Sequence, residues 1–302
     1  MNEIAKIKNL TIKFKKFKAL DKVTFNIEKN NGVIGLIGPN GAGKTTLINT
    51  ILGQLRPNIG EVLVKQNEIA YCPDVPNFEP FLTPQEVLEQ TLQLNGKKVN
   101  DFKEKIESVL ISVDLKRHSK KWSGGFSRGM KQRLGIASAL ILEPKLIFLD
   151  EPTSALDPFG QQDILNLVKK ISNERVVVIS SHNLNDIEKI ASDLIVLNKG
   201  ELIYNGSLNE FIKKDEDYMY IELKNKKVTT NILNIMKNRN INGSLYADFY
   251  IKVKSSDLSE VFVIIKEYIE SLQTITRNEL TLEEAFSEQV NKLNKSQAGE
   301  KK

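Results

Sequence analysis

The sequence predicts an α/β protein with a mainly parallel sheet, because short apolar strands alternate with helical segments along most of it. Four short, mainly apolar runs carry this prediction, since strands that helices cover on both faces are rich in apolar residues. They read GVIGLI, KLIFLD, VVVIS and LIVLNKG, at residues 32–37, 145–150, 176–180 and 194–200.

The other elements of this part follow from their periodicity. Residues 3–30 alternate apolar and polar positions, which predicts antiparallel strands, and residues 60–72 have a second strand pattern. Thr83 and Glu86 stand at the spacing of a capping box, which predicts the start of a helix. Helices are expected at residues 46–55, 83–115 and about 127–142.

A change of pattern near residue 212 indicates a second domain. We expect a large domain over residues 1–212, a small α+β domain over 213–290 and a disordered polar tail over 291–302. The charged run at 213–217 marks the boundary. The small domain has the pattern of a strand, a helix, a strand, a helix and a final helix. The third and fourth of these elements are residues 244–253 and residues 258–272.

Composition excludes several classes of protein. Apolar residues make up 40% and charged residues 27% of the 302 positions, which is a globular mixture rather than a disordered one. No apolar run reaches the roughly 18 residues of a membrane span, so any membrane role is expected through a partner. Cys72 is the only cysteine, which excludes an internal disulfide. The net charge of +5 and the lysines at 13–18 indicate a solvated strand face, and no nucleic-acid partner is expected.

Residues 38–45 read GPNGAGKT between a buried strand and a helix, which fits the phosphate-loop pattern G-x-x-x-x-G-K-[ST]. Glycines let backbone N–H groups turn toward phosphates, and the start of the helix favours an anion. Lys44 supplies a positive charge for the β- and γ-phosphates, and the Thr45 hydroxyl is a ligand for Mg²⁺. The expected nucleotide-binding residues of this loop are Gly38, Pro39, Asn40, Gly41, Ala42, Gly43, Lys44, Thr45 and Thr46.

Four further segments follow the loop in a fixed order. They read FSRGMKQR at 126–133, LDEPT at 149–153, SALD at 154–157 and SH at 181–182. In this order they resemble the signature, Walker B strand, D-loop and switch histidine of ABC ATPases. The resemblance covers about residues 3–212. It implies a P-loop NTPase fold of the ABC ATPase type, with an antiparallel β subdomain and a helical signature subdomain at about 75–142.

A second serine competes for the place of the signature serine, since Ser123 is also followed by two glycines. In the family the signature serine lies 23 positions before the Walker B aspartate, and Ser127 stands 23 positions before Asp150. Ser127 is therefore interpreted as the signature serine, and Ser123 as part of the turn before it. Arg128 takes the place of the more usual glycine.

The resemblance and the residue types together assign the chemistry. Asp150 ends a buried strand, where an ionised carboxylate needs a cation, so Mg²⁺ is its expected partner. Glu151 is placed to act on the attacking water as general base or orienter, and it is expected to be catalytic together with Lys44 and His182. The resemblance implies that His182 contacts the γ-phosphate. ATP and Mg²⁺ are the expected cofactors.

The resemblance also implies a dimer. In ABC ATPases the signature of one subunit closes over ATP that the other subunit holds. Ser127 and Gly129 are therefore expected to complete the nucleotide site of the partner subunit, aided by Asp157 at the interface.

Two positions leave alternatives open. Phe14 aligns with the aromatic residue that stacks on adenine in the family, although a phenylalanine of the strand core fits the pattern too. Asp74 stands where the family has the glutamine of its Q-loop. A carboxylate there is an acceptor for water or a ligand for Mg²⁺, but it cannot donate a hydrogen bond. Gln85, at the start of a helix, is the alternative glutamine.

Within the family the chain most resembles the ATPase subunits of ABC-2-type exporters, including those linked to antibiotic and lantibiotic resistance. The stretch from Gly129 to Pro158 and the TLEEAF segment near the C-terminus carry this resemblance. It implies a peripheral subunit on the cytoplasmic face of the membrane, as a homodimer or beside a related ATPase. Membrane association is expected only through a separate permease subunit. The alternative is a soluble ABC switch ATPase that acts on ribosomes or DNA.

Overall fold

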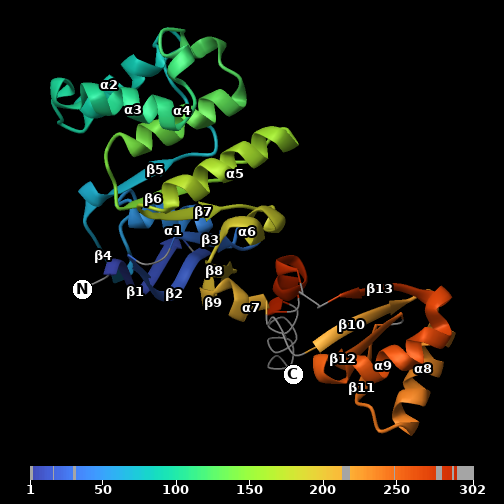
Figure 1. Ribbon diagram of the computed structural model, residues 1–302. Coiled ribbons are helices and arrows are strands. Elements are labelled where there is room, and N and C mark those ends of the chain that lie inside the picture. Colours follow the sequence, from blue (N-terminus) through green and yellow to red (C-terminus); the bar gives the residue numbers. More distant parts are fainter. Residues whose placement is uncertain are drawn as a thin grey trace. The chain divides into compact units, whose positions relative to one another are not determined.

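The computed structural model describes residues 3–15, 17–29, 32–212, 218–247, 249–276, 281–287 and 289–290 (Figure 1). The described residues divide into two units, one that runs up to Phe211 and also includes Val290, and the other running from Ile212 to Gln289. The domain limits expected at 212 and 290 stay a prediction. The charged run 213–217 and the polar tail 291–302 lie outside the described residues. In the described part of the chain, no helix is both long and apolar enough to cross a membrane.

A six-stranded sheet in the order β5-β6-β7-β3-β8-β9 forms the centre of the first unit (Figure 1). Its strands are β3 (Val33–Ile37), β5 (Ile69–Cys72), β6 (Leu146–Asp150), β7 (Val176–Ser180), β8 (Asp193–Asn198) and β9 (Glu201–Ser207). All pairs are parallel except β8 with β9. The predicted α/β fold is therefore confirmed. Since parallel strands end at the same edge, the residues that follow β3, β6 and β7 meet there.

A three-stranded antiparallel sheet, in the order β2-β1-β4, lies beside the first sheet. It consists of β1 (Glu3–Phe14), β2 (Phe17–Glu28) and β4 (Ile59–Val64). A shared apolar core joins the two sheets and α1 (Lys44–Ile51), which contributes Leu47 and Ile48. The helix that follows the phosphate loop is thus anchored in the best-packed part of this unit.

Helices cover the rest of the first unit. They are α2 (Pro84–Leu94), α3 (Lys103–Ser112), α4 (Arg128–Leu140), α5 (Pro158–Ser172), α6 (Leu184–Ile190) and α7 (Leu208–Ile212). The first three pack on one another, and α4 also contacts β5 (Figure 1). A Cβ atom added to Gly135 of α4 would lie 2.8 Å from the sulfur of Cys72, so only glycine allows this close approach. The helical subdomain therefore rests directly on an edge strand of the parallel sheet.

The second unit has the order strand, helix, strand, strand, helix, strand, and its sheet order is β11-β12-β10-β13. This is the split βαβ arrangement. The elements are β10 (Tyr218–Leu223), α8 (Lys226–Asn238), β11 (Gly243–Ala247), β12 (Tyr250–Lys254), α9 (Leu258–Ile265) and β13 (Leu272–Thr276). A further helix covers residues 282–287, and Thr281 and Glu284 form the reciprocal bonds of a capping box before it.

Two sequence interpretations of this unit are wrong. Residues 244–253 are not one strand but part of a hairpin, in which β11 pairs back on β12. Both arms have similar apolar and aromatic residues, which hides the turn. The helix expected over 258–272 ends at Ile265, and a tighter segment leads into β13, which pairs with β10. The apolar period of α9 ran on into this strand and concealed it.

Short turns of 3-10 helix complete the described elements. They are η1 (Gln66–Glu68), η2 (Val99–Phe102), η3 (Lys116–His118), η4 (Ser123–Gly125), η5 (Ser255–Asp257) and η6 (Lys266–Ser271). Ser123, the competing serine, is buried in η4 and its hydroxyl donates to the Glu79 carbonyl. It lies in the turn before the signature segment, as expected.

The capping box of α2 gives a test of the fold. The Thr83 hydroxyl accepts from the Glu86 N–H at 3.3 Å, and the Glu86 carboxylate accepts from the Thr83 N–H at 2.8 Å. Replacing Thr83 with Ala should lower the free energy of unfolding by about 1 kcal/mol, because the first turn loses its acceptor. Thr83→Ser keeps the hydroxyl and should retain most of the stability in chemical denaturation. Equal losses in both variants would contradict the cap.

Candidate active site

The phosphate loop leaves the carboxyl end of β3 and enters α1 at Lys44. Gly43 has a φ of 104°, and an added Cβ would lie 2.6 Å from the carbonyl oxygen of Ala19, so this position requires glycine. No side chain caps the N-terminus of α1. The N–H groups of its first turn are therefore available to a phosphate, as an anion site at a helix N-terminus needs.

A pocket of about 420 Å³ opens over this loop. Its lining includes residues from the loop, from the β1–β2 hairpin and from the ends of β5 and β6. They are Phe14, Phe17, Ala19, Asn40, Gly41, Ala42, Gly43, Lys44, Thr45, Thr46, Asp74, Asp150 and Glu151. Of the residues expected from the sequence, Gly38, Pro39, Ser127, Gly129 and His182 are not in this lining.

Two aromatic rings form the apolar side of the pocket. Phe14 and Phe17 are partners in the β1–β2 register, and both are exposed. Exposure of Phe14 argues against the alternative that it belongs to the strand core, because core side chains are buried. Phe17 was missed by the sequence reasoning. Its signal was an aromatic residue three positions after Phe14, across a tight hairpin.

Lys44 lies over the phosphate loop. Its ammonium donates to the carbonyl oxygens of Gly38 at 2.6 Å and of Pro39 at 3.3 Å. Burial lowers the pKa of Lys44, while the negative charges of Glu151 and Asp150 oppose the shift. A partly desolvated cation held by neutral carbonyls is well suited to receive phosphate oxygens.

Asp150 is held from two sides at the end of β6. One carboxylate oxygen accepts from the Ser180 hydroxyl, and the other accepts from the Tyr71 hydroxyl at 3.2 Å. Burial and the adjacent Asp150 carboxylate raise the pKa of Tyr71, so the phenol stays protonated and keeps donating. These bonds stabilise a carboxylate that would otherwise be costly at the end of a buried strand.

Glu151 leaves the strand with a φ of 47°, in the left-handed region. Its N–H donates to the backbone carbonyl of Ser180 at 3.1 Å and to the Ser180 hydroxyl at 3.0 Å. The Glu151 carboxylate lies 2.6 Å from Nδ1 of His182. The His182 side chain is 66% exposed and that of Glu151 is 21% exposed. The ends of β6 and β7 thus bring together Glu151 and His182, two of the residues that the sequence predicts to be catalytic.

The signature segment starts α4. Ser127 is the N-cap of this helix, and its hydroxyl accepts from the Met130 N–H at 3.3 Å. Asp157 plays the same part for α5, where its carboxylate accepts from the Gly160 N–H. The Asp74 carboxylate, in the pocket wall, lies 3.1 Å from the Arg128 guanidinium. This last contact joins the two positions at which the chain departs from the family pattern.

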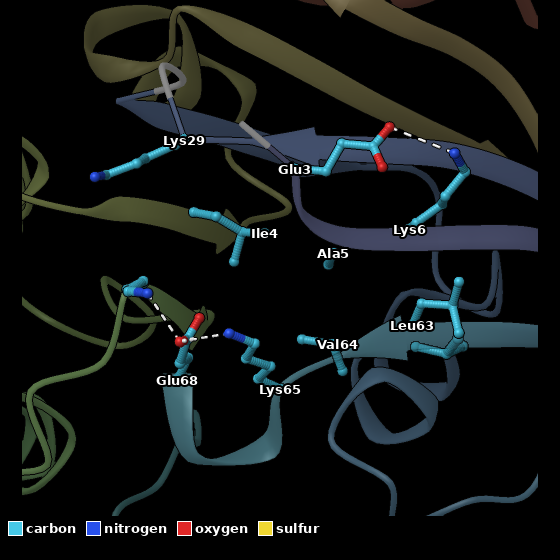
Figure 2. Close-up of a pocket in the computed structure, with 11 residues that line it drawn as sticks. Glu3, Ile4, Ala5, Lys6, Lys29, Leu63, Val64, Lys65 and Glu68 are labelled. Carbon is cyan, nitrogen blue, oxygen red and sulfur yellow. Dashed lines mark hydrogen bonds and ion pairs between the residues drawn. The ribbon is translucent and has the colours of Figure 1, made fainter. Parts of the chain in front are cut away.

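A larger pocket, of about 610 Å³, lies elsewhere, between the start of β1, strand β4 and the loop before β5 (Figure 2). Glu68 lies there between two lysines, 2.8 Å from Lys145 and 3.5 Å from Lys65. Glu3 pairs with Lys6 at 3.5 Å. None of the residues expected to carry chemistry lines this pocket, and its charges largely satisfy one another.

The residues of the smaller pocket fit a magnesium–nucleotide complex. Among the described residues, no group of three His, Cys, Asp or Glu side chains could hold a metal ion. Mg²⁺ would therefore need phosphate oxygens in addition to Thr45 and Asp150, which is how nucleoside triphosphate sites bind it. A parallel sheet, a glycine loop leading into a helix and an acidic strand end together define a P-loop nucleoside triphosphatase.

Comparison with known proteins identifies the family within the P-loop nucleoside triphosphatases. Residues 20–154 match the family model for the ABC transporter domain. The chain is 34% identical over 220 residues to YxlF of Bacillus subtilis (strain 168), an uncharacterized ABC transporter ATP-binding protein, covering 71% of this chain and 74% of that protein. It is 35% identical over 237 residues to the bacitracin transport ATP-binding protein BcrA of Bacillus licheniformis, covering 74% of this chain and 76% of BcrA.

A solved nucleotide-free ATP-binding cassette from an ABC transporter has the same fold, with a TM-score of 0.62 and 28% identity. The match covers 70% of this chain and 94% of that one. The chain therefore belongs to the ATP-binding subunits of ABC transporters. It binds ATP and hydrolyses it to power transport, as the sequence resemblance predicted. Nothing in the comparisons favours the soluble switch ATPase.

The two donors to Asp150 give a test of this geometry. Ser180→Ala removes one hydrogen bond to the carboxylate, and Tyr71→Phe removes the other while the ring stays. Each change should raise the Mg²⁺ concentration for half-maximal ATP hydrolysis by about 10- to 100-fold, because such outer partners fix a metal-binding carboxylate. Ser138→Ala, which deletes a hydroxyl bonded within α4, is the matched control. Unchanged Mg²⁺ dependence in the first two variants would refute the arrangement.

Proposed function

We propose that this ATPase subunit binds Mg²⁺–ATP in the pocket over residues 38–46, uses Glu151 to activate water and drives export through a separate membrane subunit. One observation carries the catalytic part of the proposal. The Glu151 carboxylate lies next to Asp150 at the edge of the pocket and is held by Nδ1 of His182. Glu151, Asp150 as the proposed Mg²⁺ ligand and His182 therefore lie close together near the phosphate loop.

The nucleotide is bound by groups of different kinds. The N–H groups at residues 41–46 and the Lys44 ammonium receive the phosphates, while the exposed rings of Phe14 and Phe17 stack on the base. The hydroxyl of Thr45 and the carboxylate of Asp150 hold Mg²⁺. When bound, Mg²⁺ offsets the charge of the β- and γ-phosphates.

Glu151 and His182 divide the work at the γ-phosphate. The partly buried Glu151 carboxylate is placed to take a proton from water or to orient the water for in-line attack. Because Nδ1 of His182 is bonded to the Glu151 carboxylate, the other ring nitrogen, Nε2, is left to contact phosphate. His182 thus positions the base and contacts the phosphate with the other side of its ring.

The site is completed by a second subunit. Ser127 and Gly129 do not line the pocket of their own chain, although the signature places them among the nucleotide ligands. This supports their action on ATP held by the partner subunit, with Asp157 at the interface. The positive end of α4, which Ser127 caps, suits the approach to a γ-phosphate.

Two exposed aromatic residues on adjacent segments of the helical subdomain support docking to a membrane subunit. Phe81 is 60% exposed and Trp122 is 69% exposed. Their segments are adjacent, because the Ser123 N–H donates to the Leu82 carbonyl at 2.8 Å. Exposed aromatic residues that lie together mark interaction surfaces. With the relationship to a bacitracin transport protein, this favours a permease of the exporter type and a peripheral position on the cytoplasmic side of the membrane.

The catalytic proposal predicts the behaviour of Glu151→Gln. Hydrolysis should fall by at least about 100-fold, because an amide cannot take a proton from water. ATP binding should persist, and light scattering should detect a dimer that forms with ATP and Mg²⁺. Glu143→Gln, which changes an exposed glutamate paired with Lys105, should hydrolyse ATP at the wild-type rate. If Glu151→Gln also does so, the assignment of Glu151 is wrong.

The docking proposal predicts the loss of a membrane partner. Tagged wild-type protein, purified from its native cells in mild detergent, should recover a polytopic membrane protein in near-stoichiometric amount. A Phe81→Ser and Trp122→Ser double variant should recover much less of it, since the apolar contact is removed. Leu94→Ser changes an exposed apolar side chain at the end of α2 and should behave as wild type. Recovery of ribosomal components instead would count against a transport role.

A further inference from the structure

The ion pair between Asp74 and Arg128 joins two functional parts of the chain that are 54 residues apart in sequence. Asp74 lies in the pocket wall, just after β5. Arg128 is the first residue of α4, directly after Ser127. The same pair of side chains therefore touches the nucleotide pocket at one end and the signature segment at the other.

The electrostatics of α4 explain why Arg128 needs this partner. A cation in the first turn of a helix is unfavourable, because the helix N-terminus carries a partial positive charge. The first turn of α4 has no acidic residue of its own. Asp74 supplies the missing negative charge from another segment, so each side chain compensates for the unusual presence of the other.

The ion pair between Asp74 and Arg128 is weak enough to be broken when another group binds Asp74. The side chains of Asp74 and Arg128 are 42% and 41% exposed, and an exposed ion pair is weak and screened by salt. The backbone around it is firmly packed, since an added Cβ on Gly135 of α4 would lie 2.6 Å from Pro76. The side chains can thus separate while the loop and the helix stay in place.

We propose that Asp74 and Arg128 form a nucleotide-sensitive latch, in which Mg²⁺–nucleotide in the pocket competes with Arg128 for the Asp74 carboxylate. When Asp74 turns toward the metal, Arg128 is released at the start of the signature helix, beside the Ser127 that faces the partner subunit. Nucleotide in the pocket thereby leaves the positive charge of Arg128 unpaired at the signature segment, which faces the nucleotide site of the partner subunit. This inference rests on the proposed function of the pocket.

Linkage makes the latch testable without hydrolysis. If nucleotide weakens the pair, then removing the pair must strengthen nucleotide binding by the same factor. Arg128→Gln frees Asp74 without touching the pocket lining. It should tighten the binding of a fluorescent ADP analogue by about two- to fivefold in Mg²⁺, the range of an exposed ion pair. In EDTA the gain should vanish, because the metal is what Asp74 turns to.

The controls separate the latch from a general effect of charge. Lys131→Gln removes one positive charge from the same first turns of α4 and should leave the affinity unchanged. In an Asp74→Asn background, Arg128→Gln should no longer tighten binding, because no carboxylate remains to release. Circular dichroism should show that all variants are folded, because none of these residues is fully buried.

Several outcomes would overturn the latch. Affinity equal to wild type in Arg128→Gln, or an equal gain in Lys131→Gln, would exclude it, as would a gain that persists in EDTA or in the Asp74→Asn background. A different result would contradict the proposed function, namely that Lys44→Ala binds the analogue as tightly as the wild type does. The two ideas can therefore be rejected independently.

Discussion

The Asp150 carboxylate is the constraint on which the rest of the site depends. A charged group at the end of a buried strand is expensive unless hydrogen bonds and a cation compensate for it. The neighbouring strands supply these bonds through Ser180 and Tyr71, whose own positions are fixed by the register of the sheet. The parallel order of β5, β6 and β7 is therefore not only a scaffold but the source of the donors that make a charged Asp150 possible.

The same strand ends hold Glu151, the proposed catalytic residue, in an unfavourable backbone conformation. Glu151 and Ala155 both have φ near 50°, which costs about 1–3 kcal/mol for each residue that is not glycine. The Glu151 N–H makes two hydrogen bonds to Ser180, which hold Glu151 in place. A buried hydrogen bond from the Thr153 hydroxyl to Asp186 of α6 holds the segment that leads on to Ala155. The turn is thus fixed by β7 and α6, which aims the Glu151 carboxylate at the pocket.

The sequence predicted those parts of the molecule that local patterns encode. Apolar runs located the buried strands, because this signal depends only on residues near one another. The choice of Ser127 over Ser123 rests on the spacing of the family motifs and stays a prediction. Pairings across the chain had no such signal. The hairpin of β11 and β12, strand β13 and the aromatic partner Phe17 all depend on which segments meet in space. The contact of Asp74 with Arg128 is of this kind, although each residue was already visible as a departure from the family pattern.

The contacts of the site divide into a buried set and an exposed set. Asp150, Ser180 and the backbone of Glu151 are hydrogen-bonded where burial makes an unmade bond costly, so rearranging them costs more than rearranging an exposed contact. His182, Asp74 and Arg128 are exposed, and their bonds compete with water on nearly equal terms. A change in the pocket therefore alters these exposed contacts at the lowest cost in free energy. One of these contacts, between Asp74 and Arg128, lies at the start of the signature helix, which is why the proposed latch is placed there.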